Sequence, residues 1–414
     1  MMKLNLLLVI TSSLLLSACK KNSTPKDLPQ APIGEINIKL GDSTTGGILA
    51  YNIIKTSENN FVISGAKWLY DTSVGYLNYF PFRLSINDNL NVASSKTRLT
   101  NDVGVAIQSI RSGNFIYTLI NIGNPSTNTS ANNVRIIKTD TLNNIIWSKL
   151  IDNVVRASSL TILSNGNILI QGCFGTDKLN IQNNPLFLLK INSNGDVLFR
   201  RDFIGQFYYG SKDVVEEANN YTLVAYQAGN NPNVKTFVPI LLKIDFLGNI
   251  LSSTQLDALM GNSEHYFTSF HLLKNKDGGY ILTTSNTDII DPTVGGVINE
   301  YFFIKTLRSD GVIVKSIDLT TTGNHKVIFQ ISDIIQTKNG NIYTLICCQT
   351  TSRWYTEILK FDSQANYLDY KDMLPEKFPV GLCETDNNNF IMLFNYSSGN
   401  SITVLKMDPN LNTL

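Results

Sequence analysis

The chain has 414 residues, a net charge of +1 and only 16% charged side chains. Lysine and arginine do not gather into a basic stripe, so a nucleic-acid partner is not expected. No apolar run is long enough to cross a membrane, which needs about 20 residues; the run at the N-terminus has about a dozen.

The N-terminal segment has the pattern of a secretion signal. Lys3 precedes an apolar run over residues 4–16, and residues 16–19 read Leu-Ser-Ala-Cys. A short apolar run followed by small residues is typical of a signal peptide. The Leu-Ser-Ala-Cys ending resembles a bacterial lipobox, which implies cleavage before Cys19 and acylation of its sulfur by chains such as palmitate. We predict a lipoprotein signal peptide over residues 1–18. An ordinary signal peptide with an incidental cysteine is the alternative.

Residues 19–33 are predicted to be a flexible tether, because they are polar, rich in proline and unable to bury a core. Lys20 follows Cys19 directly, with no aspartate at that position. By the sorting rule of diderm bacteria, this favours an outer membrane lipoprotein of the cell envelope, on its periplasmic face or on the cell surface. The expected partner is therefore the membrane, through the lipid anchor.

One short pattern recurs seven times in the rest of the chain. An apolar run leads into a polar turn rich in Asn or Gly, and an aromatic residue or Ile then opens a second apolar run. Asn and Gly tolerate the positive φ that tight hairpins need, so each copy predicts a hairpin. The second runs open at Phe61, Phe115, Ile168, Tyr221, Tyr280, Ile342 and Phe390.

A second pattern follows each copy of the first. It is a strand with one basic residue, then an Asp or Asn turn and, in most copies, a fourth strand. Four strands in about 50 residues are typical of a β-propeller blade, and no long stretch has helical periodicity. We predict an all-β fold, a single propeller of seven four-stranded blades over residues 34–414. The basic residues are Arg83, Lys138, Lys190, Lys243, Lys305, Lys360 and Lys406.

These basic residues admit two interpretations. We expect a structural role, in which each stem lies over the blade surface and each charge stays in water. A functional ring of charges is the alternative.

The seventh unit is too short for a fourth strand. Residues 35–40 precede the first unit and alternate as a strand does. We predict that they supply the missing outer strand and close the ring, because an open ring would leave sheet edges exposed. The alternative is that they are part of the linker.

The repeat resembles those of propeller-containing secreted proteins and lipoproteins of Bacteroidota. Residues 194–199 (Asn-Gly-Asp-Val-Leu-Phe) and 144–149 (Asn-Ile-Ile-Trp-Ser-Lys) carry this resemblance best. Blades one, six and seven depart from it, with Arg83 in place of lysine or third turns that lack glycine. The resemblance implies the fold and export, and implies little about activity, because one fold hosts many functions.

Four cysteines lie in apolar, strand-like runs. No Cys-x-x-Cys pair occurs, so a zinc site is not expected. We predict that they act as small buried hydrophobes, with pairing into disulfides left open. They are Cys173, Cys347, Cys348 and Cys383.

The connections between the second and third strands are long and variable, near residues 66–79, 121–133, 175–185, 227–238 and 285–300. Binding usually resides in long loops on a rigid scaffold. Aromatic residues assigned to the loops could stack on a sugar or anchor a protein. The alternative is that they fold back over blade edges. The candidates are Trp68, Tyr70, Tyr208, Trp354 and Tyr355.

Aligning the innermost strands predicts a polar cluster at the channel mouth. The aligned residues of blades one to seven are Asn52, Ala106, Ser159, Asp213, His271, Asp333 and Gly381. Two carboxylates and an imidazole, from Asp213, His271 and Asp333, could bind a divalent metal or perform acid–base chemistry. Solvated polar groups of a channel are the alternative.

Familiar catalytic motifs are missing: there is no Gly-x-Ser-x-Gly, His-Glu-x-x-His or Walker sequence. We therefore expect no enzyme, no catalytic residue, no cofactor and no metal. The predicted function is a membrane-anchored, non-catalytic binding or scaffold module for a glycan or an envelope protein. The alternative is a polysaccharide-acting hydrolase or lyase with its site at the channel mouth.

Overall fold

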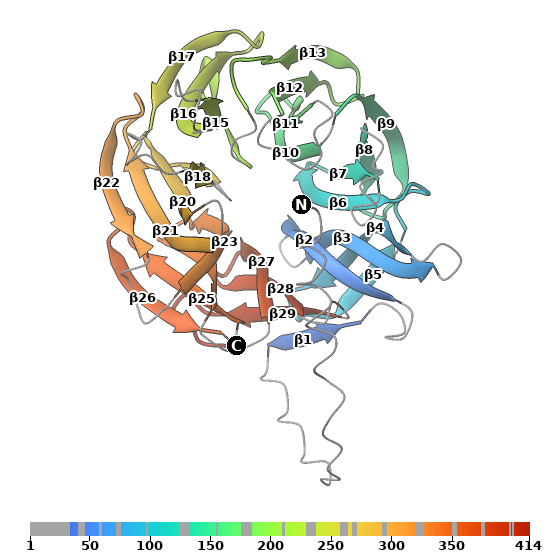
Figure 1. Cartoon of the computed structure of the whole chain (residues 1–414). Coiled ribbons are helices and arrows are strands. Elements are labelled where there is room, and N and C mark those ends of the chain that lie inside the picture. Colours follow the sequence, from blue (N-terminus) through green and yellow to red (C-terminus); the bar gives the residue numbers. More distant parts are fainter. Residues whose placement is uncertain are drawn as a thin grey trace. The chain divides into compact units, whose positions relative to one another are not determined.

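The computed structural model of the chain is an all-β ring (Figure 1). Ile33–Leu414 forms one compact unit, and no described residue belongs to an α-helix. Accordingly, this described part has no helix that could span a membrane. The structure describes residues 34–39, 46–57, 60–71, 76–96, 98–123, 133–154, 156–174, 184–208, 212–228, 237–256, 264–266, 271–291, 296–319, 327–349, 354–373, 377–396, 399 and 401–414.

The strands form seven antiparallel sheets, the blades of the ring. Blade 1 contains β2 (Gly46–Ser57), β3 (Asn60–Asp71), β4 (Tyr76–Asn87) and β5 (Val92–Lys96). Blade 2 contains β6 (Gly104–Ser112), β7 (Phe115–Ile122), β8 (Asn133–Asp140) and β9 (Ile145–Asp152). Blade 3 contains β10 (Arg156–Ile162), β11 (Ile168–Cys173), β12 (Leu186–Ile191) and β13 (Val197–Asp202). Blade 4 contains β14 (Val214–Glu216), β15 (Asn220–Ala228), β16 (Phe237–Asp245) and β17 (Ile250–Gln255).

In blade 5 the inner edge is made of two short strands that both pair with β20. This blade contains β18 (Glu264–Tyr266), β19 (His271–Lys274), β20 (Tyr280–Asp291), β21 (Gly296–Leu307) and β22 (Ile313–Asp318). Blade 6 contains β23 (Val327–Gln336), β24 (Ile342–Gln349), β25 (Trp354–Phe361) and β26 (Tyr367–Asp372). Blade 7 contains β27 (Lys377–Glu384), β28 (Phe390–Tyr396), β29 (Ile402–Met407) and β1 (Glu35–Ile38). The predicted seven-bladed propeller is confirmed.

The two kinds of turn form for local reasons. In the first-to-second strand turns, Gly113 has a φ of 57° and Asn388 a φ of 59°, as the Asn- and Gly-rich pattern predicts. In the third-to-fourth strand turns, an acid or amide binds the backbone around it. Asp140 Oδ1, for example, accepts hydrogen bonds from the backbone N–H groups of Leu142 and Asn144. These bonds, with one from the Asn144 side chain, hold the pKa of Asp140 below its ordinary value.

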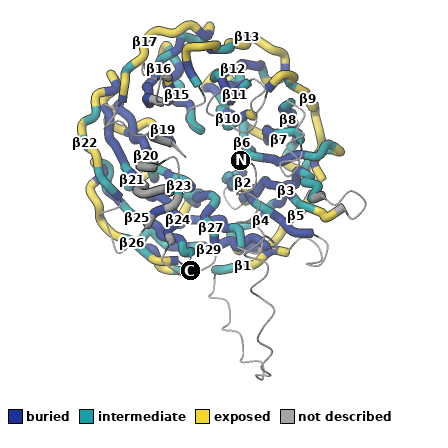
Figure 2. Tube along the Cα trace, in the orientation of Figure 1, coloured by how far each residue is buried: buried dark blue, intermediate teal, exposed yellow. Residues whose placement is uncertain are grey.

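The core lies in the middle strands, between neighbouring blades. Every residue of β11 and β12 is buried, whereas most residues of the outer strand β13 are exposed. Figure 2 shows the same gradient around the ring, with exposed residues concentrated on the outer strands. A blade packs against two neighbours, so its middle strands are buried on both faces and read as continuous apolar runs.

The repeated basic residues connect blades, and for several of them the predicted exposure is wrong. Arg83, Lys138, Lys190 and Lys305 are buried, so their charges are not left in water. Lys138 Nζ lies 4.1 Å from the centre of the Phe115 ring and donates to the carbonyl of Ser193, in the next blade, at 2.9 Å. Lys360 and Lys406 donate in the same way to the carbonyls of Pro409 and Asp88.

Blades 1 and 5 break this series. In blade 1, Ser85 stands two residues before the turn and pairs with Val62, whereas Arg83 lies two residues earlier and donates to Asn143 Oδ1 of blade 2.

In blade 5, our alignment of Lys305 with the other lysines is wrong by one residue. Lys360 lies two residues before its turn and pairs with Tyr343 of the second strand. The residue in that place in blade 5 is Thr306, which pairs with Ile281. A shift of one residue places a side chain on the other face of a strand. Lys305 therefore lies on the opposite face, and the inter-blade lysine is replaced by a threonine.

Two of the predicted long loops are hairpins instead. β3 and β4 continue to Asp71 and Tyr76, and β20 and β21 continue to Asp291 and Gly296. The aromatic and branched residues of these segments favour strands. The pairing of the second with the third strand is therefore longer in blades 1 and 5 than in the described parts of the other blades. Most residues of the other three predicted loops lie outside the described part of the chain.

The N-terminal strand closes the ring, as predicted. β1 pairs with β29, with Glu35 opposite Leu405 and Ile38 opposite Ile402, whereas Leu40 lies outside the described residues. Lys377 Nζ of the innermost strand lies 2.6 Å from Glu35 Oε1, and both side chains are almost fully buried. The two ends of the propeller are thus joined by a strand pairing and a buried ion pair.

The four cysteines of the propeller are unpaired, and three of them are buried. Burial raises the pKa of the Cys173, Cys347 and Cys383 thiols to about 12, and that of Cys348 still further. The reactive form of a thiol is the thiolate, so these thiols are almost entirely in the unreactive, protonated form at neutral pH.

We expect a Cys19→Ser chain to react with Ellman's reagent only after unfolding in urea. The four thiols should then appear together, because each becomes accessible in the same transition. Prompt release of one or more equivalents from the folded chain would show that this burial is misassigned.

Candidate functional site

Residues at the inner edges of all seven blades line one cavity of about 160 Å³. The three residues predicted to form the channel-mouth cluster, Asp213, His271 and Asp333, all lie in its wall. They come from three successive blades, so the ring brings together residues that are distant in the sequence. The other lining residues are Tyr51, Asn52, Ile107, Gln108, Arg156, Ala157, Ser158, Lys212, Ser332, Val380 and Gly381.

Asp213 and His271 form a pair within this cavity. Asp213 Oδ2 lies 3.1 Å from His271 Nδ1 and also accepts a hydrogen bond of 3.2 Å from the backbone N–H of Leu272. The Nε2 atom of His271 is buried and has no hydrogen-bond partner among the described residues. A carboxylate on Nδ1 fixes the ring and favours the tautomer whose Nε2 can accept a proton.

Asp333 lines the same cavity from blade 6, two blades after Asp213 and one after His271. Its Oδ2 accepts from the backbone N–H of Leu382 at 2.8 Å, and its Oδ1 from that of Ile334 at 2.9 Å. Burial raises the pKa of the Asp333 carboxyl, although the nearby His271 acts in the opposite direction. Both oxygens of Asp333 are therefore already engaged by the backbone.

These carboxylates share a structural role with neutral residues at related positions. Asn52 accepts from the backbone N–H of Ser109 in the next blade at 3.0 Å. Gln108 accepts in the same way from Leu160 at 2.6 Å. A side-chain oxygen of the inner strand thus holds the following blade, and Asp213 and Asp333 do this as well. The alignment had placed Ala106 here, because the first turn of blade 2 is shorter: Gln108 lies 7 residues before Phe115, whereas Asn52 lies 9 residues before Phe61.

Two cations and a phenol complete the cavity, and sequence reasoning missed all three. Arg156 is the first residue of β10, and Lys212 directly precedes Asp213. Burial lowers the pKa of Lys212, against the attraction of Asp333 and Asp213. Burial and the neighbouring Tyr79 raise the pKa of Tyr51, so its phenol keeps its proton at neutral pH. The sequence signal that could have revealed Arg156 and Lys212 is a charged residue at or just before the start of an inner strand.

The geometry does not favour the metal-binding interpretation of the cluster. Among the described residues, no three His, Cys, Asp or Glu side chains are placed to hold a metal ion. Acid–base chemistry is the interpretation that the Asp213–His271 pair supports.

The candidate aromatic residues do not form one loop surface. Trp68 and Tyr70 lie within β3, and Trp354 and Tyr355 begin β25. Tyr208 makes a bridge to Pro185 and to Tyr226. The prediction that they lie in loops is therefore wrong for these four strand residues.

Several of these rings cover parts of the blades, as the alternative predicted. The Trp354 ring lies 5.8 Å from that of Phe378, and Tyr355 packs against the core between blades 5 and 6. Burial and the neighbouring Cys348 and Glu357 raise the pKa of Tyr355. Tyr70 alone among the candidates is more than half exposed, at 52%.

Comparison with known proteins supports the fold. No family model and no curated protein matches the chain. The β-propeller domain of the Trilobed protease from Pyrococcus furiosus, described as having an open velcro topology, is 10% identical with a TM-score of 0.51, over 89% of this chain and 95% of that one. A protein of unknown function from Bacteroides caccae is 14% identical with a TM-score of 0.42, over 77% and 94%. The propeller part of the predicted resemblance is confirmed, and membership of a lipoprotein family stays a prediction.

Enzymes are frequent among the similar structures. The polysaccharide lyase Uly1 is 11% identical with a TM-score of 0.44, over 91% of this chain and 90% of that one. Others are a thermostable family-43 glycoside hydrolase and an endo-arabinase from Bacteroides thetaiotaomicron. This finding corrects our expectation of a protein without enzymatic activity. The expectation rested on missing local motifs, whereas a propeller assembles its polar residues one blade at a time.

Proposed function

We propose that the protein is an envelope lipoprotein whose channel cavity cleaves an acidic polysaccharide by elimination. The observation that carries this proposal is the Asp213–His271 pair, whose imidazole has an unpartnered Nε2 in a cavity that also holds two cations. The outer membrane location and the lipid on Cys19 remain part of the proposal.

The groups of the cavity match the needs of an elimination. Arg156 and Lys212 would neutralise the carboxylate of a uronic acid, which makes the proton on the neighbouring carbon more acidic. His271 Nε2 would take that proton as the general base. The electron pair forms a carbon–carbon double bond while the glycosidic carbon–oxygen bond breaks, and the leaving oxygen takes a proton from the Tyr51 phenol.

Elimination is favoured over hydrolysis because of how the two carboxylates are used. Glycoside hydrolases generally need a pair of carboxyl groups that can act as acid and as base or nucleophile. Here Asp213 binds a backbone N–H and the imidazole, and both oxygens of Asp333 accept backbone N–H groups. Of these three side chains, the imidazole is the one with an unpartnered atom.

A panel of polysaccharides tests this proposal. The full-length chain is incubated with polygalacturonate, alginate and the neutral polymers xylan and arabinan. We expect new reducing ends and the ultraviolet absorbance of a conjugated double bond, in equal amounts, with at least one acidic polymer. Reducing ends without the double bond would mean hydrolysis and would overturn the elimination. No cleavage of any polymer would overturn the enzymatic proposal.

A further inference from the structure

A second and larger cavity lies between blades 5 and 6. It is on the face of the ring that carries the first-to-second and the third-to-fourth strand turns. Its volume is about 650 Å³, within the range of about 300–1,000 Å³ usual for small-molecule sites. Two turns of blade 5 and one turn of blade 6 contribute to it. Its lining residues are Asn275, Asp277, Gly278, Gly279, Thr306, Leu307, Arg308, Ser309, Val314, Lys315, Gln364 and Asn366.

The cavity coincides with the break in the lysine series at blade 5. In blade 1, the other break, Arg83 reaches Asn143 of the next blade instead. In blades 2, 6 and 7, the lysine two residues before the turn reaches across to a carbonyl of the next blade. Thr306 stands in that place in blade 5 and lines the cavity. A threonine is several atoms shorter than a lysine, so it leaves uncovered a space that the long side chain occupies elsewhere.

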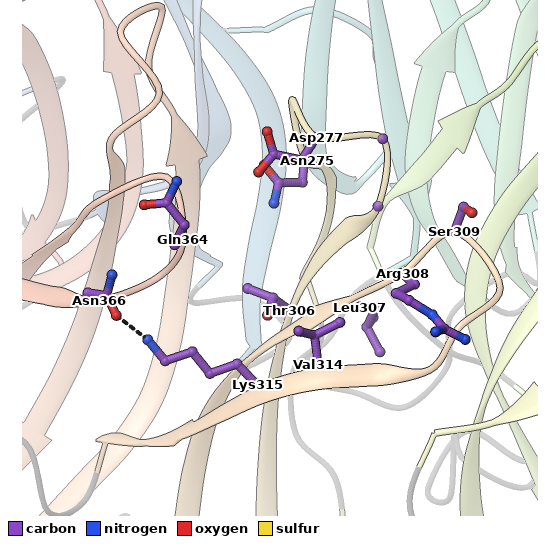
Figure 3. A pocket seen from close by; sticks show the side chains of 12 residues that line it. Asn275, Asp277, Thr306, Leu307, Arg308, Ser309, Val314, Lys315, Gln364 and Asn366 are labelled. Carbon is purple, nitrogen blue, oxygen red and sulfur yellow. Dashed lines mark hydrogen bonds between the residues drawn. The ribbon is translucent and has the colours of Figure 1, made fainter.

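The side chains around this space are polar on its walls and partly apolar on its floor. Figure 3 shows Gln364 and Asn366 on one wall and Asn275 and Asp277 on another, with Val314 between them. Within the described part of the chain, neither the Asp277 carboxylate nor the Gln364 amide has a hydrogen-bond or ion-pair partner. The amide can donate to and accept from neighbouring hydroxyl groups, and the carboxylate can accept from them.

The charges of the cavity are already compensated. The Arg308 guanidinium donates to both oxygens of Asp310. Lys315 Nζ donates to Asn366 Oδ1 at 2.5 Å and to the carbonyl of Ala365 at 3.2 Å. Asp277 adds a negative charge, so no excess of positive charge remains for an acidic ligand.

We propose that this cavity binds a short segment of a neutral oligosaccharide. The site is separate from the channel cavity and does not share a lining residue with it. It would let the protein hold a neutral glycan whether or not the channel is catalytic.

Restoring the repeat tests this proposal. In Thr306→Lys, the new stem should fill the cavity and place its ammonium near the turn of blade 6, as Lys360 does at the turn of blade 7. Ser253→Lys, on the exposed outer strand β17, adds the same charge elsewhere and serves as the matched control. Binding of xylotriose, cellotriose and maltotriose to the full-length chain is measured by calorimetry, with trigalacturonate as the acidic comparison.

We expect at least one neutral trisaccharide to bind, with affinity about tenfold or more lower in Thr306→Lys and unchanged in Ser253→Lys. Asp277→Ala and Gln364→Ala provide a second test on exposed turns, where misfolding is not expected. No neutral binding, binding untouched by these variants, or binding of trigalacturonate alone would overturn the proposal. His271→Ala should leave this binding intact, so failure of the channel proposal would be recognised separately.

Discussion

The variant His271→Ala is expected to lose cleavage of acidic polysaccharide by about 10²–10⁴-fold, the usual contribution of a general base. The imidazole is the group in the channel whose Nε2 atom is unpartnered, and Asp213 holds its other nitrogen at 3.1 Å. The rate of double-bond formation is the measurement. Asp213→Asn should reduce the rate by a comparable factor, because an amide can donate to Nδ1 and favour the wrong tautomer.

A loss of activity must be separated from a loss of fold, because Asp213 also accepts the backbone N–H of Leu272. Glu216→Ala is the matched control in the same blade. Glu216 accepts hydrogen bonds from the backbone and the hydroxyl of Ser164, in blade 3, and does not line the channel cavity. We expect this variant to unfold at lower urea concentration and to keep its rate. Full activity of His271→Ala would instead show that His271 is not the general base.

Local patterns accounted for the fold, since a hairpin depends on a few neighbouring residues. The turn at Gly113 was predictable because it needs a residue that tolerates a positive φ. The closing strand Glu35–Ile38 was predictable because the third strand of blade 7 would otherwise have an unpaired edge. The exposure of the repeated basic side chains was less predictable. The charge of Lys138 lies between an aromatic ring and a carbonyl of the next blade, and neither neighbour is adjacent to it in the sequence.

Alignment of the repeats predicted part of the site. Asp213 directly precedes β14, His271 begins β19 and Asp333 lies within β23, so all three align at the inner edges of their blades. Gln108 was missed because the first turn of blade 2 is shorter than that of blade 1, and Thr306 was missed because one residue of register separates it from Lys305. A shift of one residue turns a side chain to the other face, and an ungapped repeat cannot reveal it.

Ring closure should be the most sensitive point for stability. Glu35→Ala leaves the ammonium of Lys377 almost fully buried without its carboxylate, which lies 2.6 Å away in the native chain. Breaking a buried ion pair by removing one partner costs about 3–5 kcal/mol. We expect a clear decrease in the urea midpoint of the full-length chain, followed by fluorescence. Lys39→Ala, an exposed residue directly after β1, should change stability by no more than about 0.5 kcal/mol.

The double variant Glu35→Leu with Lys377→Met distinguishes the ion pair from the strand. An apolar pair of similar volume removes both buried charges, so it should recover most of the lost stability if the cost lies in the unpaired ammonium. If Glu35→Ala were as stable as the native chain, the ion pair would not contribute to closure. The pairing of β1 with β29 and the burial of Ile38 in the core between blades 7 and 1 would then carry the closure.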